Sequence, residues 1–135
     1  YMEPRTTLRG LLETERGKEP FAAPARLLEV ALSRDFGRYL EPSLDSVPVC
    51  FLSDADTTGG NSGSPVVNGR GELVGLNFDR VFENVAGDFG WSPEVSRNVC
   101  VDVRYVLWLA EKVDGARELL AERSGTAGTR ASAAR

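Results

Sequence analysis

The sequence predicts a chain of mixed class, mainly antiparallel β with helices at both ends, and three observations support this. Short apolar runs with the character of strands lie in the middle of the 135 residues, at 47–52, 65–67, 72–79 and 98–102. A Gly-rich turn at 68–71 joins two of these runs, which favours a hairpin and therefore antiparallel pairing. Apolar residues at helical spacing lie before and after this region, at 24–35 and 103–113.

The N-terminal part is expected to consist of short helices joined by loops. Residues 7–15 can form a helix with three leucines on one side, and Pro20 breaks it. Pro24 suits the first turn of a second helix, which extends to about residue 35. Residues 36–46 are expected to form a connector that contains Gly37 and Pro42.

The middle of the chain is expected to alternate strands with loops. Pro48 indicates a strand start or an edge position, because proline has no N–H to donate to a neighbouring strand. Loops are expected at 53–64 and 80–97, and a loop as long as the second is often functional. Its aromatic residues can wall a substrate cleft, but they are interpreted as core packing: Phe82, Phe89 and Trp91.

The C-terminal part is expected to be helical. The helix begins at Asp102 or the next residue, and Asp102 is placed to cap it. Its apolar face is expected to carry Val103, Val106, Leu107, Ala110 and Val113. An Asp-Gly pair at 114–115 interrupts the helix, a second helical stretch follows at 116–123, and 124–135 are expected to be disordered.

The composition excludes several functional classes. A net charge of −4 gives no electrostatic support for nucleic-acid binding, and no apolar run is long enough to span a membrane. The two cysteines, Cys50 and Cys100, are interpreted as buried and unpaired, with a disulfide between them as the alternative. Without histidine they do not make a zinc site, so neither a metal nor a cofactor is predicted.

The stretch Thr-Gly-Gly-Asn-Ser-Gly-Ser-Pro, residues 58–65, carries the strongest functional signal. A phosphate-binding loop would need a downstream lysine and a helix, whereas the next residues form a strand. A loop that carries a nucleophilic serine and an oxyanion hole fits better, and a simple Gly/Ser-rich surface turn is the alternative. The residue two before Ser62 is Gly60, which adopts the required backbone shape more readily than the serine two before Ser64. Ser62 is therefore the predicted nucleophile, with the Gly60 and Ser62 N–H groups as the oxyanion hole.

The absence of histidine restricts this hypothesis. A Ser-His-Asp triad cannot be completed within these 135 residues, so the base for Ser62 must lie outside them. The only lysines, Lys18 and Lys112, are far from Ser62 in sequence, which argues against a Ser-Lys dyad. The chain also begins with Tyr1 rather than Met, so it is expected to be a fragment of a longer protein.

Residues 60–65 resemble the Gly-Asp-Ser-Gly-Gly-Pro loop of chymotrypsin-like serine peptidases, with Asn and Ser replacing Asp and the third Gly. The longer run 49–80, together with 6–10 and 101–107, resembles serine peptidase family 46, the bacterial dipeptidyl peptidases, and within it the Asp/Glu-specific branch. This resemblance extends to about residue 122. It implies a C-terminal fragment that is inactive alone, because the histidine and aspartate of the triad lie upstream.

The resemblance also implies a fold and a division of the chain. The fold is the second barrel of a chymotrypsin-like double β-barrel with flanking helices and a C-terminal helix. Residues 1–46 would form a helical and loop segment at the junction with a missing helical domain. Residues 47–123 would form the C-terminal half of the peptidase domain, and 124–135 a disordered tail.

The resemblance further assigns roles to two neighbouring residues of the predicted hairpin. Asp79 would bind the free amino group of the substrate, and Arg80 would select Asp or Glu before the scissile bond. A simple exposed charge pair at a strand end is the alternative for both. Asp56, six residues before Ser62, lies where trypsin-like enzymes carry a pocket aspartate, so a pocket for Lys or Arg is a rival hypothesis.

The expected function is therefore a serine exopeptidase that releases N-terminal dipeptides. The alternatives are an endopeptidase of the glutamyl-specific or periplasmic quality-control kind, and a non-catalytic peptide-binding module. The expected partners are peptide substrates and the upstream part of the same polypeptide, and a homodimer is a further expectation. The resemblance implies a periplasmic or secreted protein.

Overall fold

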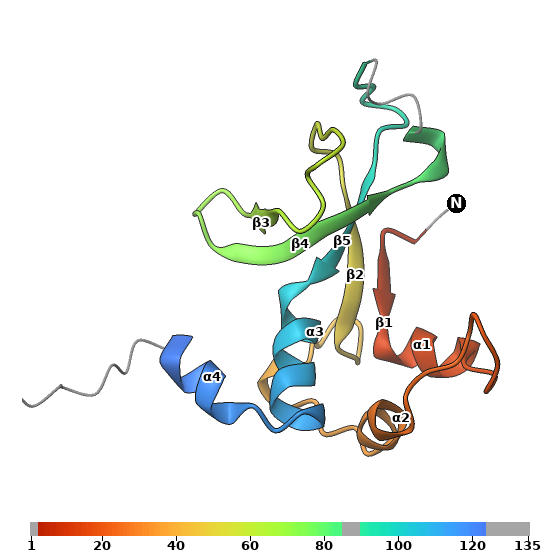
Figure 1. Cartoon of the computed structure of the whole chain (residues 1–135), viewed down its shortest axis with the longest axis vertical. Helices are drawn as coiled ribbons and strands as arrows, with labels where there is room; N and C mark the ends of the chain where they lie inside the picture. Colours follow the sequence, from red (N-terminus) through yellow and green to blue (C-terminus); the bar gives the residue numbers. More distant parts are fainter. Residues whose placement is uncertain (1–2, 85–89, 124–135) are drawn as a thin grey trace, which may run out of the picture.

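A five-stranded antiparallel sheet forms the centre of the computed structural model, which describes residues 3–84 and 90–123 (Figure 1). The strand order is β1-β2-β5-β4-β3. The strands are β1 (Arg5–Thr7), β2 (Pro48–Ser53), β3 (Pro65–Val67), β4 (Leu73–Arg80) and β5 (Asn98–Asp102). The predicted mixed class and the predicted hairpin are both confirmed, since β3 pairs with β4 antiparallel. The predicted disorder of 124–135 lies outside the described residues.

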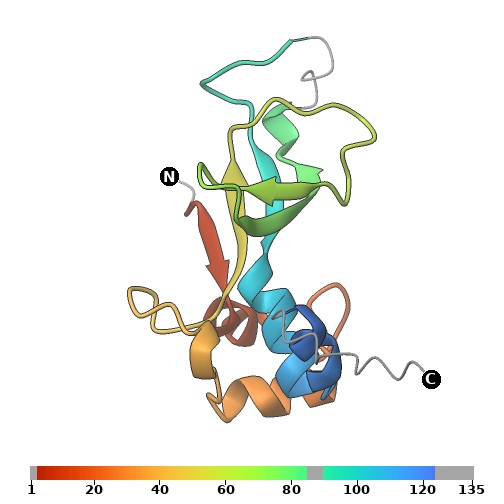
Figure 2. The ribbon, with the colours of Figure 1, turned by 90° about the vertical axis from the view of Figure 1, so that its left-hand side faces the viewer.

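In the described part of the chain, six helices gather at one end of the sheet, whereas a short 3-10 turn at 82–84 and the loops that follow β2 and β4 lie at the other (Figures 1 and 2). The six helices are α1 (Leu8–Thr14), α2 (Ala25–Leu32), the 3-10 helix η1 (Gly37–Tyr39), α3 (Val103–Trp108), the π-helix η3 (Leu109–Val113) and α4 (Arg117–Arg123). Within the described ranges, no helix has the length and apolar character that crossing a bilayer requires.

The helix ends follow from local hydrogen bonds. The Thr7 side chain accepts from Gly10 N–H at the start of α1, and the Asp102 carboxylate accepts from Arg104 N–H at the start of α3. The capping role predicted for Asp102 is thus confirmed. Helix α1 ends at Thr14, before it reaches Pro20, because Glu15 already has extended backbone angles. The prediction that Pro20 ends this helix was wrong.

The main apolar core lies at the helical end. Its buried members come from both ends of the chain: Leu8, Val30, Ala31, Phe36, Tyr39, Val47 and Trp108. Trp108 is 0% exposed, and its indole N–H donates to the Asp35 carbonyl at 3.0 Å. The helical face predicted for 103–113 is confirmed in part, because Leu107 and Val113 are partly buried against the core, but the fully buried residue of this stretch is Trp108, which was not predicted. The change from α- to π-helix at Leu109 alters the spacing that the prediction assumed.

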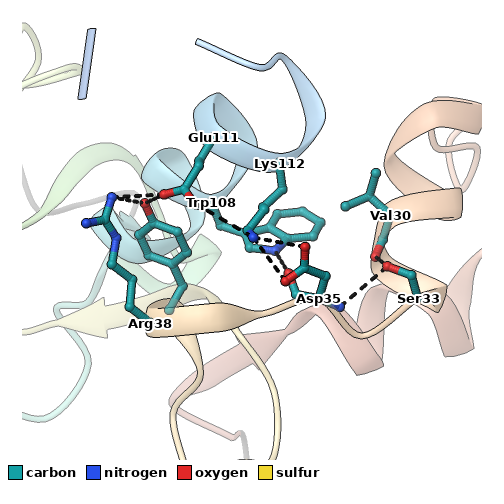
Figure 3. A network of polar contacts seen from close by, with 8 residues as sticks. Val30, Ser33, Asp35, Arg38, Trp108, Glu111 and Lys112 are labelled. Carbon is teal, nitrogen blue, oxygen red and sulfur yellow. Dashed lines mark hydrogen bonds and ion pairs between the residues drawn. The ribbon is translucent and has the colours of Figure 1, made fainter. Parts of the chain in front are cut away.

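Polar contacts surround this core (Figure 3). The Lys112 ammonium bonds both carboxylate oxygens of Asp35, at 3.0 and 2.9 Å. The Tyr39 hydroxyl donates to the Glu111 carboxylate at 2.6 Å, and Arg38 donates to the same oxygen at 2.9 Å. The hydrogen bond from Tyr39, together with the nearby Arg38, lowers the pKa of Glu111. These bonds join the connector after α2 to the π-helix.

Strand β1 was not predicted, because residues 3–7 are polar. It forms by pairing with β2, where Pro4 accepts from Leu52 N–H at 2.9 Å and the Thr6 hydroxyl accepts from Cys50 N–H at 3.1 Å. Pro48 is the first residue of β2, as one of the two predicted options required. The edge option was wrong, because β2 lies between β1 and β5.

The two cysteines are free. In the pairing of β2 with β5, Cys50 lies opposite Val101 and Cys100 lies opposite Phe51. Because side chains alternate along a strand, the two sulfur atoms point to opposite faces of the sheet. The unpaired interpretation is confirmed, although Cys50 is half-buried rather than buried.

Candidate active site

Residues 54–64, here called the serine loop, connect β2 to β3 and fold as two consecutive β-turns. The first closes with Asn61 N–H donating to the Thr58 carbonyl at 3.2 Å, and the second with Ser64 N–H donating to the Asn61 carbonyl at 3.0 Å. The third residue of each turn is a glycine with positive φ, +98° at Gly60 and +85° at Gly63. A type II turn requires this conformation, which glycine adopts without strain. Ser62 therefore lies at the corner of the second turn.

Asn61 belongs to both turns, and it closes the first turn with two hydrogen bonds to Thr58. Its side-chain oxygen accepts from Thr58 N–H at 2.8 Å, while its own N–H bonds back to Thr58. This agrees with the predicted structural role of Asn61 in tying the loop together.

Asn77 of β4 fixes the loop to the sheet. Its carbonyl accepts from Gly63 N–H at 2.7 Å and its N–H donates to the Ser64 carbonyl at 2.9 Å. Its side-chain amide also donates to the Asn61 carbonyl at 3.3 Å. The backbone on both sides of Ser62 is thus held in place, while Ser62 itself is exposed.

The predicted oxyanion donors are open to a ligand. Within the described ranges, neither Gly60 N–H nor Ser62 N–H donates a hydrogen bond to another part of the chain. The neighbouring N–H groups of Asn61, Gly63 and Ser64 are all bonded internally. This pattern leaves the two predicted groups available for an external acceptor.

A β-bulge in β4 sets the direction of Arg80. Asn77 lies opposite Cys100, yet Asp79 lies opposite Val99, so one extra residue is inserted at Phe78. As a result Arg80 pairs with Asn98 and lies on the same face of the sheet as Asn77. Bulges are common beside active sites because they redirect a side chain in this way.

A cavity of about 190 Å³ brings the predicted residues together. Ser62 lies on its wall with Thr57, Thr58 and Gly59 of the serine loop, and Asp79 and Arg80 lie on its other wall with Asn77 and Phe78. The Asp79 carboxylate also accepts from Arg80 N–H at 2.8 Å. A serine, an acidic residue and a basic residue thus line one small cavity.

Asp56 is not part of this lining. It is exposed and lies one residue before Thr57, the first residue of the serine loop that does line the cavity. Its position therefore gives no support to the rival hypothesis of a pocket for Lys or Arg.

The aromatic residues of the second loop are not core residues. Phe82 is 86% exposed and Trp91 is 45% exposed, so the core-packing interpretation was wrong for both. The Trp91 indole N–H donates to the Asp54 carbonyl at 2.9 Å, which joins the second loop to the serine loop. Phe89 lies outside the described residues.

The 135 residues contain no histidine that could serve as the base for Ser62. Lys112 is bonded to Asp35 at the helical end. Burial raises the pKa of the Cys100 thiol, which is thus protonated at neutral pH. Among residues 3–84 and 90–123, no three potential metal ligands come together.

The sequence of this chain also matches a known protein family. Residues 1–124 match Peptidase S46. The chain belongs to the S46 peptidase family.

Curated relatives are 41–47% identical to this chain. They include an "Asp/Glu-specific dipeptidyl-peptidase" of Shewanella putrefaciens, which is 43% identical and matches 90% of this chain. A "Dipeptidyl-peptidase 7" of Phocaeicola vulgatus is 47% identical and matches 87% of this chain. The chain spans only 20% and 16% of the length of these relatives.

Solved S46 structures share the fold. The crystal structure of Porphyromonas endodontalis DPP11 in complex with the dipeptide Arg-Asp superposes on 90% of this chain with a TM-score of 0.85 and 38% identity. The chain spans 17% of that structure. The antiparallel sheet with its helices is therefore an S46 fold.

Overall identity does not separate the two kinds of S46 relative. An "Asp/Glu-specific dipeptidyl-peptidase" of Porphyromonas gingivalis is 46% identical, close to the 47% of the dipeptidyl-peptidase 7. Overall identity therefore does not indicate which kind of substrate preference the chain shares.

Three polar residues of the site were missed from the sequence: Thr57, Asn77 and Asn98. The two asparagines are buried in strands, where asparagine is uncommon. That mismatch between residue type and predicted strand was the available signal. It marks the points where the sheet fixes the serine loop.

Proposed function

We propose that this chain supplies the nucleophile and the specificity pocket of a serine dipeptidyl peptidase that releases N-terminal dipeptides with Asp or Glu before the scissile bond. The observation that supports it is the cavity shared by Ser62, Asp79 and Arg80. Each of these residues answers one chemical requirement of the reaction.

Ser62 attacks the scissile carbonyl. Its proton passes to a histidine that, in this proposal, lies in the upstream part of the polypeptide with its aspartate. The oxygen that becomes negative accepts from the free Gly60 and Ser62 N–H groups, and one such donor typically stabilises the transition state by about 3 kcal/mol. The fixed turns on both sides of Ser62 keep these groups in place.

Asp79 sets the distance from the substrate N-terminus at which cleavage occurs, and Arg80 selects the substrate side chain. The Asp79 carboxylate binds the free α-ammonium group, which limits cleavage to two residues from the N-terminus. The Arg80 guanidinium pairs with the carboxylate of an Asp or Glu side chain, for which its planar shape and permanent charge are suited. An endopeptidase would not need a carboxylate at position 79.

The same proposal includes the fold of the complete peptidase domain, its location in the cell and its oligomeric state. The sheet forms part of the second barrel of a chymotrypsin-like double β-barrel, with 1–46 at the junction to a helical domain and 47–123 completing the peptidase domain. The upstream polypeptide supplies the remaining triad residues. The protein acts in the periplasm or outside the cell, and it forms a homodimer.

The test uses the full-length protein that contains this chain. It should hydrolyse a fluorogenic dipeptidyl reporter with a free amino group and Asp at the second position, and N-acetylation should abolish this hydrolysis. A fluorophosphonate probe should label Ser62, as mapped by mass spectrometry. Equal cleavage of free and acetylated reporters, or labelling of another serine, would overturn the proposal.

A further inference from the structure

Asn98 lies behind the candidate site and bonds the serine loop with both ends of its side chain. Its amide N–H donates to the Ala55 carbonyl at 2.6 Å, and its oxygen accepts from the Thr57 hydroxyl. The residue is 1% exposed and begins β5. Both bonds cross more than 40 residues of sequence, so they define where the loop sits relative to the sheet.

Asn98 is also fixed relative to the opposite wall of the cavity. It pairs directly with Arg80 in the register of β4 and β5. The same residue therefore contacts the serine-loop wall through its side chain and the Arg80 wall through the strand pairing. The spacing of Thr57 and Arg80 across the cavity depends on this connection.

Side-chain packing around Thr57 is incomplete, so the hydrogen bond from Thr57 to Asn98 matters for its position. A second cavity, of about 220 Å³, is also lined by Thr57, together with Asn98, Asn77 and Cys100. Thr57 and Asn77 line both cavities and so separate them. Because Thr57 borders both cavities, side-chain packing restrains it less than a core residue, and its bond to Asn98 is a direct restraint on its position.

We propose that Asn98 is a positioning residue for substrate specificity: by holding Ala55 and Thr57, it sets the width of the cavity in which Arg80 selects the substrate side chain. This inference rests on the proposed function. Asn98 itself lines only the second cavity, so it acts through Thr57 rather than by touching the substrate.

The experiment compares two variants of Thr57 in the full-length protein. Thr57→Val keeps the shape of the side chain but removes the hydroxyl that bonds Asn98, whereas Thr57→Ser retains that hydroxyl. The measured quantity is the ratio of kcat/KM for dipeptidyl reporters with Glu and with Leu at the second position. Thr57→Val should lower this ratio by about tenfold or more, because the acidic side chain no longer meets Arg80 in a cavity of fixed width. Thr57→Ser should stay within about twofold of the wild type.

Two further variants complete the test. Asn98→Asp places an acceptor against the Ala55 carbonyl and should lower the same ratio. Thr14→Val removes a hydroxyl that bonds only carbonyls of α1 and should leave the ratio unchanged. A purely structural role would lower activity on both reporters alike.

The outcomes separate this inference from the proposed function. An unchanged Glu to Leu ratio in Thr57→Val overturns the role of Asn98, provided that the wild type prefers Glu. A wild type without dipeptidyl peptidase activity overturns the proposed function first, and the positioning role with it.

Discussion

The two ends of the molecule are held by different kinds of interaction. At the helical end, a buried apolar cluster around Trp108 is surrounded by ion pairs and hydrogen bonds that use Asp35 and Glu111. At the loop end, the serine loop is held by hydrogen bonds from Asn61, Asn77 and Asn98, and Thr57 lines two cavities. Figures 1 and 2 show these ends at opposite sides of the sheet.

The difference indicates a division between stability and chemistry. Apolar burial stabilises a fold without specifying the direction of a polar group, whereas hydrogen bonds fix the direction of N–H and O–H groups. Changes at the helical end should therefore alter stability more than turnover. Changes at the loop end should do the reverse.

The largest expected effect is that of Ser62→Ala on turnover. Removing the nucleophile should lower kcat by about 10⁴- to 10⁶-fold, as in other serine peptidases. The melting temperature should hardly change, because Ser62 is exposed. Steady-state kinetics and thermal denaturation of the full-length protein test both parts. Normal turnover in the variant would show that another residue is the nucleophile.

Trp108→Ala should have the opposite effect. Truncating a fully buried aromatic residue costs about 3–5 kcal/mol of folding free energy. Faster hydrogen exchange of amides in α1 and α3 is the expected observation. The matched control is Phe82→Ala, which removes an aromatic side chain that is 86% exposed and should change exchange very little. Equal effects of the two variants would contradict the assigned core.

Asp79→Asn should weaken cleavage of free dipeptidyl reporters. Loss of one member of a charged pair costs about 2–5 kcal/mol when the partner is desolvated. The control is Asp56→Asn, which neutralises an exposed carboxylate outside the cavity lining and should leave kcat/KM near the wild-type value. If Asp56→Asn were the more damaging change, the rival pocket aspartate would be supported instead.

The smallest expected effect concerns pH and Glu111. Its pKa is lowered in the folded protein by the Tyr39 hydrogen bond and by Arg38. A carboxyl group with a lower pKa in the folded state stabilises the fold above its unfolded pKa, and this contribution is lost as the pH falls through the folded value. Glu111→Gln should therefore lose less stability than the wild type between about pH 5 and pH 3. If the melting temperatures of Glu111→Gln and the wild type fell equally with decreasing pH, this role of Glu111 would be contradicted.

Much of the fold could be predicted from local patterns, and the failures have physical causes. The turn at 68–71 and the apolar strands gave the hairpin and the antiparallel class. Strand β1 could not be predicted, because its polar residues become a strand only by bonding β2. The buried position of Trp108 was not predicted, because it depends on the indole N–H bond to the Asp35 carbonyl, 73 residues away in the sequence.

The candidate site was predicted in part. Ser62, Asp79 and Arg80 were named from the sequence, and the structure brings them to one cavity. Their roles remain predictions. The bulge at Phe78 and the contacts of Asn98 were not predicted, because both depend on the register between strands that are far apart in sequence.

Substrate preference at the second position tests the central claim most directly, namely that Arg80 in the Ser62 cavity selects an acidic side chain. The full-length protein is assayed with dipeptidyl reporters that carry Asp, Glu, Leu, Phe, Lys or Arg there. Asp and Glu should be preferred over Leu and Phe by about a hundredfold in kcat/KM, and Arg80→Gly should reverse this order. A best rate with Lys or Arg, or an unchanged preference in Arg80→Gly, would contradict the claim.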